Sequence, residues 1–70
     1  MRRFTAALVR RREVVAALKA DGWVLARTKW AHAQYRHDSK PGLVTVPMHP
    51  GDLPIGTLKS IEKQAAIRLL

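Results

Sequence analysis

The chain has 70 residues, and its thirteen Lys and Arg against five Asp and Glu give a formal net charge of +8 at pH 7. It contains no cysteine, which excludes a disulfide framework and a thiolate metal site. No apolar stretch approaches the roughly 20 residues that cross a bilayer. We therefore expect one small cytoplasmic domain that does not span a membrane.

The excess of positive charge predicts a partner of opposite sign. A polyanion is attracted over long range and releases counterions when it binds, so nucleic acid is the first expectation and an acidic protein is the alternative. A membrane is not among the expected partners. The charge is also compatible with a basic surface that is simply well solvated.

The first part of the chain is basic and carries apolar residues at helical spacing. Residues 1–11 are interpreted as a basic N-terminal extension that can be helical, and a single domain is expected over residues 12–70. A helix is predicted over residues 12–22, with Gly22 in the left-handed conformation that ends it. The apolar stripe, which Arg11 interrupts, consists of Phe4, Ala7, Leu8, Val14, Val15 and Leu18.

Three short β segments follow. WVLARTK (23–29) and HAQYRH (32–37) are rich in strand-forming residues and are separated by about two residues, which predicts a hairpin. DSKPG (38–42) is typical of a turn. LVTVP (43–47) predicts the third strand, which ends at Pro47 because proline cannot donate a ladder hydrogen bond.

The last part of the chain predicts a loop and a second helix. Residues 49–56 are the expected loop, and Thr57 is the expected N-cap residue of the helix. The order of elements predicts an α+β fold of the α-β-β-β-α type, in which two helices cover one face of a three-stranded antiparallel sheet. The buried stripe of the last helix is expected to consist of Leu58, Ile61, Ala65 and Leu69.

Alternation along the second strand separates a core face from an open face. Ala33 and Tyr35 mark the core side, whereas His32, Gln34 and Arg36 share the other. His32 is therefore expected to point outward among cationic groups. From the residues alone it is either an ordinary surface side chain or an acid/base group, because imidazole exchanges protons near neutral pH and RNA carries its own nucleophile in the 2′-hydroxyl.

Other kinds of catalytic site lack support in the sequence. His32 and His37 point to opposite faces of a regular strand, His49 belongs to a distant loop, and no carboxylate stands at a ligand spacing. Neither a metal nor another cofactor is therefore expected. A cysteine nucleophile is absent, and Ser39 and Ser60 have no nearby candidate base.

Four stretches, LKADGWVLARTK, HAQYRH, KPGLVTVP and LPIGTLKSIEKQA, resemble the HicA family of bacterial toxins in order and spacing, between Arg12 and Ile67. The resemblance implies a small mRNA interferase with a fold like that of double-stranded-RNA-binding domains. It also implies a catalytic histidine at the start of the second strand, and His32 falls on that position. The implied partner is a HicB antitoxin, which covers the toxin and blocks its site.

The chain departs from the family beside that histidine. A Gly-Ser-His segment opens the second strand in the family, whereas Trp30 and Ala31 occupy the first two positions here. If the turn needs a positive φ, Trp30 is strained by roughly a kcal/mol or more, and Ala31 lacks a hydroxyl group. The indole either stacks on an unpaired base, which is typically worth about 1 to 3 kcal/mol, or packs against the sheet.

The basic residues form three groups. One would surround the outward-facing histidine and hold a phosphate, and a pair at i,i+4 spacing forms a ridge on the last helix. Each of these groups is alternatively a solvated face. The third group is interpreted as part of the extension, or as an electrostatic tether: Arg2, Arg3, Arg10, Arg11 and Arg12. The predicted RNA contacts are Arg27, Lys29, Trp30, Gln34, Arg36, Lys59 and Lys63.

These observations combine into one hypothesis, an endoribonuclease toxin that cleaves mRNA without a metal. In this hypothesis His32 removes the proton of a 2′-hydroxyl or protonates the leaving 5′-oxygen, and a cyclic phosphate results. A HicB-like antitoxin is expected to inhibit the enzyme. The main alternative is a non-catalytic RNA-binding module of the same fold, which Trp30 and Ala31 favour. A protein that only engages an acidic partner also fits the charge.

Overall fold

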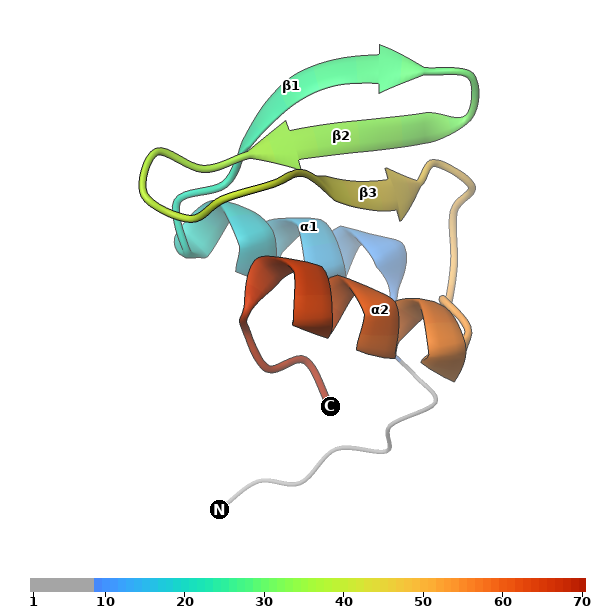
Figure 1. The fold of residues 1–70 in the computed structure, drawn as a ribbon. Helices are drawn as coiled ribbons and strands as arrows, with labels where there is room; N and C mark the ends of the chain where they lie inside the picture. The colour runs from blue at the N-terminus through green and yellow to red at the C-terminus, as the bar shows by residue number, and fades with distance from the viewer. Residues whose placement is uncertain (1–8) are drawn as a thin grey trace.

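The computed structural model describes residues 9–70 and contains two helices and three strands in the order α-β-β-β-α. Both helices lie on the same side of an antiparallel sheet whose strand order is β1-β2-β3 (Figure 1). The predicted α+β fold is confirmed. The elements are α1 (Arg11–Ala20), β1 (Val24–Lys29), β2 (His32–Arg36), β3 (Val44–Pro47) and α2 (Ile55–Ala65).

The end of α1 shows why a glycine stands there. Gly22 has a φ of +102°, its amide donates to the carbonyl of Lys19, and the amide of Trp23 donates to the carbonyl of Leu18. A side chain at this position would place its Cβ 2.8 Å from Nε2 of His37. Glycine is thus needed for both its conformation and its size, and the predicted left-handed residue is confirmed.

The strand pairing places His32 on the central strand, at one end of the sheet. Lys29 pairs with His32 across the two-residue turn, and Pro47 of β3 pairs with His32 on the other side. The register between β1 and β2 shifts between Leu25 and Arg27, which is the mark of a β-bulge. His32 is therefore flanked by the last residues of both neighbouring strands.

The core lies between the helices and the inner face of β2 and β3. Ala33 and Tyr35 are buried and pair with Val46 and Val44 of β3, which confirms the predicted alternation. Partners across a ladder share a face, so the two strands present one apolar surface to the helices. The buried residues are Val9, Val14, Leu18, Trp23, Ala33, Tyr35, Val44, Val46, Leu53, Leu58, Ile61 and Ala65.

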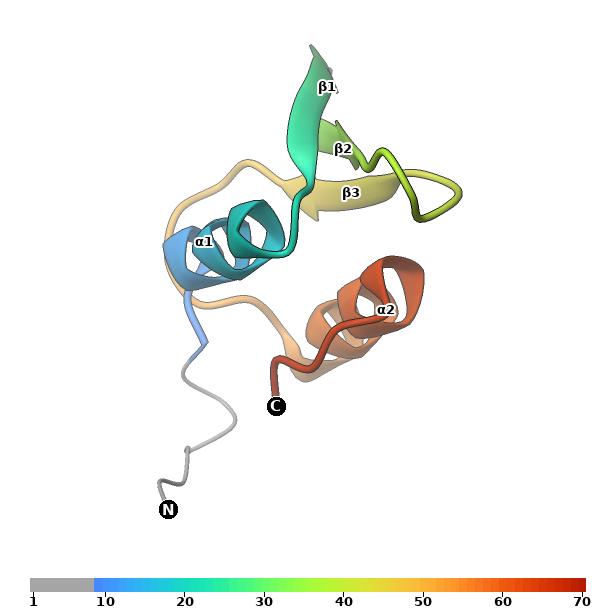
Figure 2. The same ribbon diagram turned by 90° about the vertical axis from the view of Figure 1, so that its left-hand side faces the viewer.

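β1 differs from the other two strands because it lies beyond the area that the helices cover. Figure 2 shows it rising away from both helices, while β3 lies directly above them. All six of its residues are exposed, including the apolar residues Val24 and Leu25. β1 is therefore attached to the domain through its pairing with β2 rather than through buried side chains.

The start of α2 corrects the predicted helix cap. The helix begins at Ile55, and the N-cap position is held by Pro54 in an extended conformation, without a side-chain hydrogen bond. The carbonyl of Pro54 accepts the amide of Leu58, so the proline supplies the first intrahelical acceptor. The prediction that Thr57 caps the helix is wrong, because Thr57 already lies within its first turn.

The end of α2 corrects the predicted position of Leu69. The helix ends at Ala65, and Ala66 takes a left-handed φ of 56°. Nζ of Lys40 donates to the carbonyls of Ala65 and Ala66 at 3.1 and 3.3 Å, while Oε2 of Glu62 accepts the amide of Leu69 at 2.6 Å. These side chains satisfy the groups that a longer helix would pair, and the hydrogen bonds to backbone amides, that of Leu69 first, lower the pKa of Glu62. Leu69 packs against the core from outside the helix.

Most of the predicted N-terminal extension, with its helical stripe, lies outside the described residues. Its last residues contact the loop before α2: the carbonyl of Val9 accepts the amide of Leu53 at 3.2 Å, and the amide of Arg11 donates to the carbonyl of Gly51 at 2.8 Å. None of the helices within residues 9–70 has the length and apolarity that a bilayer crossing requires.

Candidate active site

His32 lies at the first position of β2 on the uncovered face of the sheet, as the alternation predicts. Its side chain is exposed, and the structure gives its ring no hydrogen bond or ion pair with another of the residues 9–70. Both ring nitrogens are thus available to solvent or to a ligand. An imidazole in this situation can both take up and release a proton.

Cationic side chains adjoin His32 on the same face. Lys29 lies directly across from it in the β1–β2 ladder. Arg27 pairs with Gln34 in the same ladder, and its Nε donates to Oε1 of Gln34 at 2.7 Å. The amide side chain therefore fixes the orientation of the guanidinium, whose terminal nitrogens are left for a ligand. The structure brings these four predicted residues together on one face.

The other three predicted basic contacts lie further away. Arg36 is four positions along β2 from His32, which corresponds to about 13 Å of strand, and its Nη1 contacts Asp38 at 3.2 Å. Lys59 and Lys63 are exposed on α2, which lies on the opposite side of the sheet (Figure 1). An RNA chain would have to extend well beyond His32 to reach any of the three.

Trp30 occupies the first position of the turn between β1 and β2. Its φ is 60°, so the turn does need a positive φ at the position where the resembling family carries glycine. Its side chain is 87% exposed, and the alternative that the indole packs against the sheet is therefore wrong. A large aromatic ring held open in a strained turn beside His32 is available for stacking.

Two contacts at this end of the sheet were not foreseen from the sequence. The amide of Met48 donates to the carbonyl of Ala31 at 2.9 Å, which ties the loop after β3 to the Trp30 turn. Nε of Arg11 donates to the carbonyl of Pro47 at 2.8 Å. The only signal for Arg11 in the sequence is that it interrupts an apolar stripe, because its partner lies 36 residues away.

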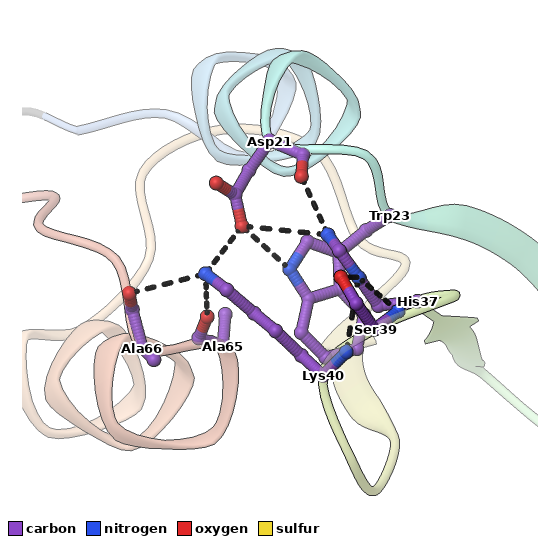
Figure 3. A network of polar contacts seen from close by, with 7 residues as sticks. All are labelled: Asp21, Trp23, His37, Ser39, Lys40, Ala65 and Ala66. Atoms are coloured by element: carbon purple, nitrogen blue, oxygen red, sulfur yellow. Dashed lines mark hydrogen bonds and ion pairs between the residues drawn. The ribbon is translucent and has the colours of Figure 1, made fainter.

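His37 follows the last residue of β2, and both nitrogens of its ring make hydrogen bonds. Nε2 contacts the carbonyl of Asp21 at 2.6 Å, and a carbonyl can only accept, so Nε2 carries the proton. Nδ1 accepts the amides of Ser39 and Lys40 at 3.0 and 3.1 Å, and the ring meets Trp23 edge-on at 5.1 Å (Figure 3). Both ring nitrogens are thus engaged within the fold, which gives His37 a structural role.

Lys40 joins this cluster to both helix ends (Figure 3). Its Nζ lies 2.6 Å from Oδ2 of Asp21 and also donates to the carbonyls of Ala65 and Ala66. The indole nitrogen of Trp23 donates to the same carboxylate at 3.1 Å. The hydrogen bond from Lys40, followed by its charge, holds the pKa of Asp21 below its ordinary value.

The candidate site provides acid/base and phosphate-binding groups. Within residues 9–70 no three His, Asp or Glu side chains gather as they would around a metal ion. What the site does bring together is one imidazole, one ammonium group and one oriented guanidinium. Such a set can hold an anionic phosphate and move a proton next to it.

The family model of the HicA toxin of bacterial toxin–antitoxin systems matches residues 11–67. The matched region contains both helices, the whole sheet and the candidate site. Among curated proteins, no sequence matches the chain. Because the family model covers most of its length, the chain belongs to the HicA family of toxins.

Proposed function

We propose that this toxin cleaves mRNA by acid/base catalysis from His32, without a metal ion. At the family level, membership supports a toxin that cleaves mRNA and has an antitoxin partner. The observation that supports His32 as the catalytic group is its exposed ring, which no other described residue binds, directly across from Lys29.

In the proposed reaction the nucleophile comes from the RNA. His32 takes the proton of a 2′-hydroxyl, whose oxygen attacks the neighbouring phosphorus. The bond to the 5′-oxygen breaks, and this oxygen receives a proton from His32 or from water. The products are a 2′,3′-cyclic phosphate and a free 5′-hydroxyl. One acid/base group contributes roughly 10² to 10⁴-fold in rate, so turnover is expected to be slow.

The other residues of the site hold the substrate. Lys29 and Arg27 stabilise the negative charge that builds up on the phosphate, and Gln34 orients Arg27 through the hydrogen bond between them. Trp30 stacks on an unpaired base beside the cleaved bond. The remaining basic contacts, Arg36, Lys59 and Lys63, bind more distant parts of the RNA backbone and contribute affinity that depends on salt.

The proposed partner protein is a HicB-like antitoxin that covers the open face of the sheet. The proposal includes a cytoplasmic location, where both mRNA and such an antitoxin are found. An acidic antitoxin would match the cations around His32. Because these same cations bind the substrate, the antitoxin and the RNA are expected to compete.

A second function, a non-catalytic RNA-binding module, is favoured by the turn before β2. Trp30 takes a positive φ of 60° at a position that glycine fills without strain, and Ala31 brings no hydroxyl group to the neighbourhood of His32. These residues favour stacking over chemistry. The two functions differ in one measurable property, which is whether bound RNA is cut.

The test uses the unmodified protein with two RNA substrates of the same sequence. Cleavage is expected to continue in excess chelator and to give a cyclic phosphate end. A substrate in which hydrogen replaces the 2′-hydroxyl at the cleavage position should bind but remain intact. If the all-ribose substrate is bound and never cut, the protein is a binding module. Cleavage of the deoxy-substituted position would show that the 2′-hydroxyl is not the nucleophile.

A further inference from the structure

Three consecutive arginines line a hollow close to the candidate active site. Arg10, Arg11 and Arg12 form its wall together with Pro50 and Gly51, and its volume is about 230 Å³. The structure places this hollow between the beginning of α1 and the loop that joins β3 to α2. These arginines were interpreted from the sequence as a tether outside the site.

The hollow carries more positive charge than its neighbours neutralise. Arg10 forms a loose contact with Asp52, with 3.8 Å between Nε and Oδ1. Arg11 is anchored through Nε to a neutral carbonyl, that of Pro47, so its charge has no counter-ion there. Arg12 is exposed, and within residues 9–70 no ion pair involves it. Glu13, in the same turn of α1, accepts the amide of Arg10 at 2.9 Å, so three arginines stand beside two carboxylates, those of Asp52 and Glu13.

A backbone contact links the hollow, on the helix side of the sheet, to the strand that pairs with His32. Pro47, which Arg11 holds at 2.8 Å, is the residue that pairs with His32 across the β2–β3 ladder. The first turn of α1, the Trp30 turn and the loop after β3 all lie at one end of the molecule, on the right in Figure 1. The side chain of Arg11 therefore connects the start of α1 to the strand pair that carries His32.

We propose that this arginine-lined hollow binds a backbone phosphate of the RNA next to the phosphate that is cleaved. The inference rests on the proposed function, because it extends the path of the same RNA chain. A planar guanidinium group can donate two parallel hydrogen bonds to two oxygens of one phosphate. The hollow has room for a phosphate. An acidic protein segment is a weaker match, since Pro50 is the one apolar side chain among the five lining residues, which is too little to anchor such a segment.

Binding measurements can test the inference without any cleavage. The probe is a single-stranded RNA whose 2′-hydroxyl groups are all methylated, so that it binds but is not cut. Its affinity is compared over a range of salt for the unmodified protein, for Arg10→Ala/Arg12→Ala and for Lys19→Ala/Arg68→Ala. Both variants lose two positive charges from exposed positions, and Arg11 is left in place because it anchors Pro47.

The inference predicts that Arg10→Ala/Arg12→Ala lowers affinity at low salt by roughly tenfold, as expected when hydrogen bonds between charged groups are removed. The slope of log affinity against log salt should become shallower by about 0.7 for each phosphate that the variant no longer neutralises. The control variant should retain most of the affinity and slope. With the cleavable RNA, the arginine variant should raise KM and leave kcat unchanged.

Three results would overturn the inference. In the first, the two double variants change the slope equally, which would mean that only overall charge matters. In the second, Arg10→Ala/Arg12→Ala binds RNA normally but no longer binds the antitoxin, which would assign the hollow to the protein partner. The third result applies if that double variant unfolds. The single variant Arg12→Ala is then measured in its place, and unchanged RNA binding by Arg12→Ala would overturn the inference. A protein that binds the methylated RNA but cuts no ribose substrate would refute the proposed catalysis while leaving the hollow testable.

Discussion

His32 and His37 stand at the two ends of the same strand, and their surroundings are opposite. His37 has only 11% of its side chain exposed, and its two nitrogens are used by Asp21, Ser39 and Lys40. His32 is exposed, and no other described residue binds its ring. The difference teaches that residue type alone does not identify a reactive histidine. A ring whose nitrogens are already bonded has no lone pair or proton to offer a substrate.

The same contrast holds for the cations near each histidine. At the His37 end, Lys40 contacts Asp21 and two helix-end carbonyls, so its ammonium group serves the fold. At the His32 end, Lys29 is exposed and has no ion pair within the described residues. One end of the sheet therefore uses its polar groups in contacts within the fold, and the other leaves them exposed.

The largest expected effect is that of His32→Ala on cleavage. Loss of the only proposed acid/base group should lower the cleavage rate by roughly 10² to 10⁴-fold, while RNA affinity stays within a few-fold because cations carry most of it. The free energy of unfolding should not change, since an exposed side chain contributes little packing. Single-turnover cleavage, RNA titration and urea unfolding measure these three quantities. Undiminished cleavage by His32→Ala would show that the exposed histidine is not the catalytic group.

His37→Ala should give the reverse pattern. Removing the ring leaves the amides of Ser39 and Lys40 and the carbonyl of Asp21 without their partner, which should cost about 1 to 3 kcal/mol of unfolding free energy. The folded variant should still cleave RNA at the normal rate. Urea unfolding and cleavage assays of the two alanine variants, made side by side, measure the contrast. Unchanged stability of His37→Ala would show that its hydrogen bonds are replaced by water at no cost.

Trp30→Gly tests the role of the turn at the His32 end. Glycine takes the positive φ of this turn without strain, so stability should rise by about 1 kcal/mol. Affinity for single-stranded RNA should fall by about 1 to 3 kcal/mol if the indole stacks on a base. Thermal unfolding and RNA titration measure the two effects. Tighter RNA binding by the glycine variant would contradict the stacking role.

The smallest expected effect is the acid dependence of the His37 end. Lys40 lowers the pKa of Asp21 below its ordinary value of 3.8, so this carboxylate stabilises the fold above that pH. The contribution disappears as the pH falls through the lowered pKa of the folded state. Asp21→Asn should therefore be less stable than the unmodified protein near neutral pH, and the gap should narrow below about pH 4. Urea midpoints between neutral and acid pH measure the gap. A gap of constant size would mean that the charge of Asp21 plays no part.

Local patterns were enough to predict most of the fold. The alternation in β2 and the glycine that ends α1 depend on neighbours in the sequence, and both are confirmed. Alternation also predicted which face carries His32, whereas its catalytic role comes from the family resemblance and stays a proposal. The limits of α2 were wrong at both ends, because they depend on Pro54 and on contacts from Lys40, 25 residues from Ala65.

The features missed around the site were missed for the same physical reason. Arg11 holds a carbonyl 36 positions away, and no period or motif in the sequence indicates such a contact. The exposure of Trp30 was equally hidden, since an indole in a short turn has room both to fold back and to project. Tertiary geometry decided each of these cases.

The attachment of β1 has a consequence for how the domain opens. Because none of its six residues is buried, its separation from β2 breaks ladder hydrogen bonds but takes no buried side chain of β1 out of the core. We expect its amides to exchange with deuterium well before those of β3, through a partial opening that leaves the rest folded. In that opening Arg27 and Lys29 leave with β1, whereas His32 stays on β2, which Ala33 and Tyr35 anchor in the core. We therefore expect the two chemical parts of the proposed site, the imidazole and the cations proposed to bind phosphate, to belong to units of different local stability.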